Sequence, residues 1–137
     1  MNWWPIIKNL QDYLQTQTGL SGITIIAGGT DEHIYPRIEI LWDEENGVDP
    51  HKKDKGCITL WIDCWAENND PEVATVYDLL YELQIGFFNA LKEWPKFLSI
   101  ELNLAAKVTV GRTVSDGGTS RPITGSRTIL EIEWRRK

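Results

Sequence analysis

Two stretches of the chain carry apolar residues at every third or fourth position, which is the spacing of a helix that buries one face. The first stretch runs from Trp3 to about Gln17. Asn2 can cap its start, Pro5 is tolerated in its first turn, and Gly19 is a suitable stop. The apolar positions of this predicted helix are Trp4, Ile7, Leu10 and Leu14.

The second helical stretch is the longest element that the pattern predicts. It begins at Asp70-Pro71-Glu72, where an Asp cap, a Pro at the first helical position and an acid near the positive end of the dipole occur together. Pro95 limits the helix, which should therefore end near residues 92–94, and residues 98–104 are interpreted as extended. Its apolar positions are Val73, Val76, Tyr77, Leu80, Leu83, Phe87, Leu91 and Trp94.

Strict alternation of apolar and polar residues predicts strands elsewhere. Residues 23–26 form a short apolar run, and residues 37–43, 57–65, 107–112 and 127–135 are longer candidates. The inward positions are expected to be Ile38, Ile40 and Trp42, then Ile58, Leu60, Ile62 and Cys64, and finally Leu130, Ile132 and Trp134. The opposite face of the second candidate carries Thr59, Trp61, Asp63 and Trp65, whose two tryptophans need a cover.

The predicted order is α-β-β-β-α-β-β in one domain, residues 1–137. Two hairpins and two helices in that order favour an α+β fold, a two-layer sandwich with a mostly antiparallel sheet of about five strands and both helices on one face. The last hairpin carries a long connection, residues 114–125, which we call the arm.

The arm reads V-S-D-G-G-T-S-R-P-I-T-G, with almost no apolar residue. Connections longer than about 12 residues inside a compact domain are usually functional or disordered. The arm contains Asp116 and Arg121 and is flanked by Arg112 and Arg127. Two interpretations stay open, a segment that reaches a partner and a hairpin tip without a role.

Composition fits a protein of about one domain without a membrane span. The chain has 137 residues, 42% of them hydrophobic and 25% charged, and no apolar run approaches the roughly 20 residues of a membrane helix. We see no secretory signal, so a cytoplasmic protein is the default expectation. Cys57 and Cys64 lie seven residues apart in one predicted strand, on opposite faces and roughly 23 Å apart, too far for a disulfide.

Charge is distributed unevenly along the chain. Residues 1–106 hold 7 Lys and Arg against 17 Asp and Glu, a net charge of −10, whereas residues 107–137 hold 7 against 3, a net charge of +4. One interpretation is an acidic surface that ends in a basic tail. The other is a self-complementary molecule in which one face attracts the opposite face of the next copy, a geometry that gives rings or filaments.

The sequence lacks a recognisable catalytic or metal-binding pattern. His33 and His51 fall in different polar loops, without the HxxxH or HExxH spacing of a zinc site. Gly28-Gly29-Thr30 lacks the Lys of a phosphate loop, and no G-x-S-x-G occurs. We therefore expect a protein that is not an enzyme and has no cofactor.

Seven tryptophans are many for this length. Trp4, Trp42, Trp94 and Trp134 fall on predicted core faces, whereas Trp3, Trp61 and Trp65 do not. Tryptophan serves as a core residue, as an anchor of subunit interfaces and as a platform for sugars, and all three roles stay open. The residues that we single out as interface candidates are Trp61, Trp65, Arg112, Asp116, Arg121 and Arg127.

The layout resembles the small tail-terminator and tail-completion proteins of tailed bacteriophages and prophages. The resemblance covers most of the chain and depends on element order and on short patterns, Y-P-R-I at residues 35–38 and R-T-I-L-E-I-E-W at residues 127–134. It implies a ring, commonly a hexamer, at the head-proximal end of the tail tube. Such a ring stops tube growth, contacts the tail-tube protein and the head-completion or connector protein, and lets DNA pass through its lumen.

We therefore predict a structural virion protein of the tail, assembled in the cytoplasm of the bacterial host. A head–tail connector or neck protein of the same particle is an alternative. Two rival hypotheses come from other classes of protein. One is a small ligand- or carbohydrate-binding module that uses exposed Trp, and the other is a small hydrolase.

Overall fold

One five-stranded sheet organises the computed structural model, which describes residues 2–30, 32–48, 51, 54–68, 73–115 and 123–137. Its strands are β1 (Thr24–Ala27), β2 (Arg37–Asn46), β3 (Lys55–Glu67), β4 (Leu104–Ser115) and β5 (Ile123–Arg136), in the spatial order β1-β2-β3-β5-β4. Only β1 and β2 are parallel among these neighbours, so the sheet is mostly antiparallel, as predicted.

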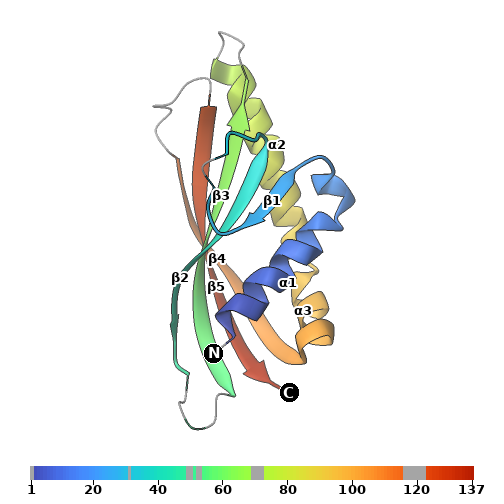
Figure 1. Ribbon diagram of the computed structural model, residues 1–137, viewed down its shortest axis with the longest axis vertical. Coiled ribbons are helices and arrows are strands. Elements are labelled where there is room, and N and C mark those ends of the chain that lie inside the picture. Colours follow the sequence, from blue (N-terminus) through green and yellow to red (C-terminus); the bar gives the residue numbers. More distant parts are fainter. Residues whose placement is uncertain (1, 31, 49–50, 52–53, 69–72, 116–122) are drawn as a thin grey trace.

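The helices α1 (Trp3–Gln15), α2 (Val73–Leu91) and α3 (Trp94–Leu102) cover one face of the sheet (Figure 1). A short 3-10 helix, Thr18–Leu20, links α1 to β1. This arrangement confirms the predicted α+β class with two layers. We call the other face of the sheet, which carries the odd-numbered residues 57–65 of β3, the outer face.

The prediction that residues 98–104 are extended is wrong. Pro95 lies in the first turn of α3, where a missing N–H removes no helical hydrogen bond, so the proline starts a helix there. Asn103 ends α3 in the left-handed conformation, with a φ of 55°. The chain then turns directly into β4, which begins at Leu104.

The strands bury the faces that alternation predicted. Ile58, Leu60, Ile62 and Cys64 of β3 are all at most 1% exposed, and their neighbours on β2 and β5 pack beside them. The helices cover this core on one side, with apolar residues that recur at every third or fourth position. The largest fully buried side chains of the helices are Ile6, Ile7, Leu10, Leu14, Phe87, Trp94 and Leu98.

Among the residues whose burial the structure describes, three that were predicted for the core lie at the surface. Trp4 is 48% exposed and Tyr77 is 47% exposed, because each lies at the edge of its helix's buried face. Trp42 is 45% exposed where the pairing register of β2 shifts between Trp42 and Glu44. The ring of Trp3, which packs against the core, stacks on Trp42 with centroids 4.2 Å apart.

The predicted helix cap at Asn2 is also wrong. The Asn2 side chain makes no capping hydrogen bond, and its Nδ2 is buried without a partner among the described residues. Its backbone N–H instead donates to Glu45 Oε2 of β2 over 3.4 Å. The start of α1 is thus held by a tertiary contact.

The arm is shorter than predicted, because both strands of the last hairpin extend into it. Val114 pairs with Arg127 and Ser115 with Ser126, while Ile123 and Thr124 already pair with β3. Residues 116–122, which include Asp116 and Arg121, lie outside the described residues. None of the described helices is long and apolar enough to cross a membrane.

Candidate functional site: a groove on the outer face of the sheet

A groove of about 400 Å³ crosses β3, β5 and β4 on the outer face. It is lined by side chains that include Trp61, Trp65, Arg112, Val114 and Arg127, and we call it the Trp61–Trp65 groove. The register of the strands explains why these side chains lie together. Trp65 pairs with Gly125, Trp61 pairs with Ile129, and Arg127 pairs with Val114. The structure therefore brings together four of the six interface candidates. The other two, Asp116 and Arg121, are outside the described residues.

Gly125 makes room for one wall of the groove. A Cβ built on Gly125 would lie 2.5 Å from Cε3 of Trp65 and 2.7 Å from Cζ3, far inside contact distance. Only a glycine lets the indole lie this close to the neighbouring strand. The Trp65 Nε1 is buried and has no hydrogen-bond partner among the described residues.

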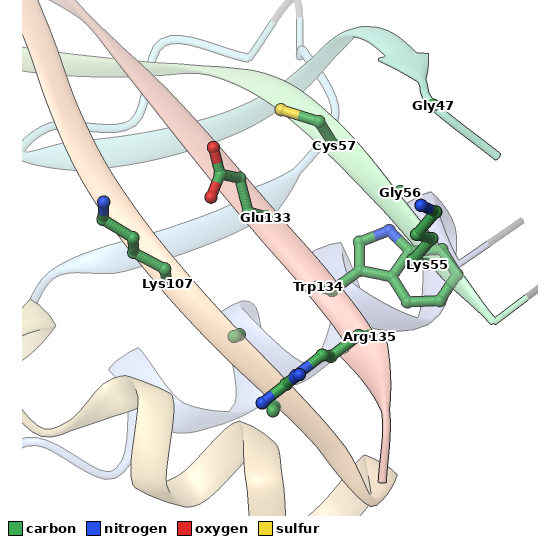
Figure 2. Close-up of a pocket in the computed structure, with 10 residues that line it drawn as sticks. Gly47, Lys55, Gly56, Cys57, Lys107, Glu133, Trp134 and Arg135 are labelled. Carbon is green, nitrogen blue, oxygen red and sulfur yellow. The ribbon is translucent and has the colours of Figure 1, made fainter.

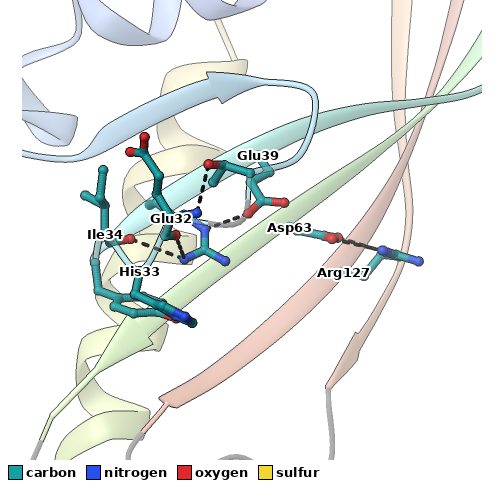
Figure 3. Close-up of polar contacts among 9 residues, drawn as sticks. Glu32, His33, Ile34, Glu39, Asp63 and Arg127 are labelled. Carbon is teal, nitrogen blue, oxygen red and sulfur yellow. Dashed lines mark hydrogen bonds and ion pairs between the residues drawn. The ribbon is translucent and has the colours of Figure 1, made fainter.

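Arg127 is held in place by Asp63 on the neighbouring strand. Its Nε donates to Asp63 Oδ1 and its Nη2 donates to Asp63 Oδ2, both over 2.9 Å (Figure 3). This two-point hydrogen bond raises the pKa of Arg127, so the guanidinium stays charged. Its Cζ also lies 4.1 Å from the ring centroid of Trp61, a cation–π distance. The pair presents a fixed positive group beside an aromatic surface.

A second charged pair borders the groove on β2. Arg37 Nε donates to Glu39 Oε1 over 2.6 Å, and both residues are buried. The Arg37 guanidinium also donates to the backbone oxygens of Glu32 and Ile34, which Figure 3 labels. The Cζ of Arg37 lies 5.3 Å from the ring centroid of Trp65. The connection between β1 and β2 is thereby tied to the outer face. Alternation along the strands places Arg37, Glu39 and Asp63 on this face. It does not predict the ion pairs that Arg37 forms with Glu39 and that Asp63 forms with Arg127.

A second hollow, of about 580 Å³, lies at the opposite end of β3 and β5 (Figure 2). Trp134 lies under Gly56 there, and its Nε1 donates to Glu45 Oε2 over 3.2 Å. Lys107 of β4 and Cys57 of β3 each pair in register with Glu133 of β5 between them. Burial raises the pKa of the Cys57 thiol. Nearby carboxylates, of which Glu131 has the largest effect, raise this pKa further, so the thiol is poorly activated as a nucleophile.

The other candidate chemistry of the sequence is not gathered into a site. Both cysteines are free, as predicted, and burial beside Asp63 raises the pKa of Cys64 to about 12. His33 contacts the hydroxyl of Tyr35 at 3.3 Å. Within the described ranges, no three His, Cys, Asp or Glu side chains lie close enough together to hold a metal ion.

The helix layer carries an exposed surface of its own on α2. Tyr77, Tyr81 and Ile85 follow one another at four-residue spacing, and Asp78 and Glu82 lie beside them. We call these five residues the α2 stripe. All five are exposed, and α2 carries no Lys or Arg along its length.

Fold and surface together define a small α+β protein with an aromatic and basic groove on one face and an aromatic and acidic stripe on the other. No protein-family model matches the chain, and no curated protein matches it. One similar solved structure, whose name states no activity, is 12% identical with a TM-score of 0.49, covering 96% of this chain and 92% of that chain. A likeness of that size carries no argument about function.

Proposed function

We propose that this protein is a structural subunit that works by assembling with copies of itself into a ring. The observation that carries the proposal is the Trp61–Trp65 groove, where two half-buried tryptophans and two arginines line a hollow on the sheet face away from the helices. Tryptophan and arginine are the residues most enriched among the anchors of protein interfaces.

The residues around the groove suit binding rather than catalysis. The carboxylate of Asp63 forms an ion pair with Arg127, and the carboxylate of Glu39 forms an ion pair with Arg37. Both acids are therefore engaged in structural contacts. Neither thiol has the lowered pKa of a nucleophile. Rigid aromatic surfaces with fixed charges instead offer contact area at a small cost in side-chain entropy.

The biological setting that we propose follows from the resemblance of the sequence to tail-terminator and tail-completion proteins. In that setting the ring sits at the head-proximal end of a phage or prophage tail tube, ends tube growth and contacts the head connector. A neck protein of the same particle is the alternative within this class. Patterns at residues 35–38 and 127–134 support the proposal; the first leads into β2 and the second belongs to β5.

The mass of the protein in solution tests the proposal. We expect sedimentation velocity or native mass spectrometry to find a closed species of several copies of the 15.7 kDa chain, either alone or with the tail-tube protein from the same genome. A monomer under both conditions, at concentrations up to about 1 mM, would reject the ring. Deleting the gene should then leave particles without normal tails.

A ligand-binding module is the second candidate, and one observation favours it. Trp42 and Trp4 are both about half exposed beside Trp3, in one aromatic cluster at the start of α1. Such a cluster could stack on a sugar ring. This candidate predicts that oligosaccharides quench tryptophan fluorescence, that Trp42→Ala abolishes the quenching, and that the protein stays monomeric.

A further inference from the structure

The Trp61–Trp65 groove and the α2 stripe lie back to back across the sheet. Gln84 of α2 donates to Ser126 Oγ of β5 over 2.8 Å, and Ser126 is flanked by the groove residues Gly125 and Arg127. The helices of the described part of the chain lie on the sheet face opposite the groove (Figure 1). A copy that placed its α2 stripe in the groove of the next copy would leave its own groove free for a third.

Charges on the two surfaces are opposite. The groove carries Arg112, which makes no ion pair with any described residue, and Arg127, whose charge is shared with Asp63. The stripe carries Asp78 and Glu82, which make no ion pair within the described part of the chain either. Groove against groove, or stripe against stripe, would bring like charges together, which costs affinity.

Size and chemistry of the two surfaces also agree. The stripe runs over nine residues from Tyr77 to Ile85, which is eight helical rises or about 12 Å. The groove wall runs over five residues from Trp61 to Trp65, which is four strand rises or about 13 Å. Both surfaces place aromatic rings next to charge, so tyrosines would meet tryptophans and carboxylates would meet guanidinium groups.

From these observations we infer that the Trp61–Trp65 groove binds the α2 stripe of a second copy of this chain. The contact is heterologous, because two different surfaces meet, and a heterologous contact closes into a ring when its rotation permits. The inference rests on the proposed ring and names the two surfaces that build it. It also gives the charge division of the chain a physical role, since Arg112 and Arg127 belong to the basic segment 107–137 and α2 to the acidic segment 1–106.

Two variants that each lose one surface test the inference. The groove variant carries Arg112→Ser and Val114→Ser, and the stripe variant carries Tyr81→Arg and Glu82→Arg, so the two altered surfaces do not attract each other. All four positions are exposed, so both variants should fold, which circular dichroism and thermal unfolding can verify. Ile100→Arg is the matched control, because Ile100 is an exposed apolar residue on α3, 80% accessible and outside both surfaces.

We expect each variant alone to be a monomer, whereas the control assembles like the wild type. Mixed in equal amounts, the two variants should form a one-to-one dimer with twice the single-chain mass and nothing larger. The intact stripe of the groove variant fits the intact groove of the stripe variant, and the two damaged surfaces then end the assembly.

Other outcomes reject the inference in distinguishable ways. Assembly of either variant to the wild-type mass would mean that the altered surface is not the interface, although the ring itself would stand. A mixture that stays monomeric would exclude head-to-tail pairing of these two surfaces. A wild type that is monomeric alone and with tail-tube protein would overturn the ring and the inference together.

Discussion

Gly125 shows how a single missing side chain shapes the outer face. The Trp65 ring occupies the space of a Cβ at this position, and Trp65 in turn forms the wall of the groove beside Arg37 and Trp61. The other contacts of this wall, the Asp63–Arg127 pair and the ring of Trp61 beneath Arg127, are equally local. A change at one residue here should therefore move the neighbouring aromatic ring before it disturbs the core.

The first prediction concerns Gly125→Ala. The added methyl group must displace Trp65, and overpacking of this kind costs about 1–3 kcal/mol in the free energy of unfolding. Urea unfolding should measure that loss, together with a shift in tryptophan emission. Gly19→Ala is the control, since a Cβ at Gly19 meets nothing within 4 Å. Equal stability of the two variants would show that Trp65 does not pack against Gly125.

The second prediction follows from the buried thiol of Cys64. Burial, with Asp63 adding to it, raises the pKa of this thiol from 9.0 to about 12. Above pH 9 the unfolded thiol loses its proton while the folded one keeps it, so the folded state is disfavoured as the pH rises toward 12. The expected loss from this group between pH 8 and pH 10 is about 1.4 kcal/mol.

Urea unfolding of wild type and of Cys64→Ala at the two pH values measures this loss. The variant has no thiol at that position, so its free energy of unfolding should fall by about 1.4 kcal/mol less than that of the wild type. Cys57→Ala is the control, because it keeps the Cys64 thiol and should keep that thiol's part of the loss, while it removes only the contribution of the less buried Cys57. The same alkaline loss in wild type and in Cys64→Ala would contradict the assignment.

At the scale of elements, the strands follow the predicted alternation, whereas α3 departs from the prediction. A period of two identifies buried faces directly, and the register of β3 with β5 then brings Trp61, Trp65 and Arg127 together. The sequence did contain a helical signal for α3, since Trp94, Leu98 and Leu102 are four residues apart. The prediction treats Pro95 only as the end of α2, although a proline can also begin a helix.

The contact between Trp65 and Gly125 illustrates what the sequence could not provide. Sixty residues separate the two positions, and their pairing depends on the register of two strands that are not consecutive in the chain. Local patterns indicate which face a side chain occupies, but they do not fix its partner across strands. Local patterns therefore predict several members of the groove but not its shape.

The third prediction concerns the turn between α3 and β4. Asn103 has a φ of 55°, a conformation that β-branched residues adopt only with strain and that glycine adopts freely. Asn103→Val should lower the free energy of unfolding by about 1–2 kcal/mol, whereas Asn103→Gly should change it by less than about 0.5 kcal/mol. Thermal unfolding of the two variants compares them directly. A Val variant as stable as the Gly variant would mean that this turn is not left-handed.

At the scale of the whole molecule, the fold converts a charge division along the chain into two opposite surfaces. The basic segment supplies β4 and β5 and thus the arginines of the groove, while the acidic segment supplies α2 on the far side of the sheet. A sheet with helices on one face only is well suited to this division, because its two faces are free to carry different chemistry. Head-to-tail assembly is the consequence that we propose.

The most direct test of this account is the mass of the mixed groove and stripe variants in sedimentation velocity, with the wild type measured beside them. We predict a ring-sized species for the wild type, a 15.7 kDa monomer for each variant alone, and a one-to-one dimer for the mixture. A mixture that remains monomeric while the wild type assembles would contradict the account.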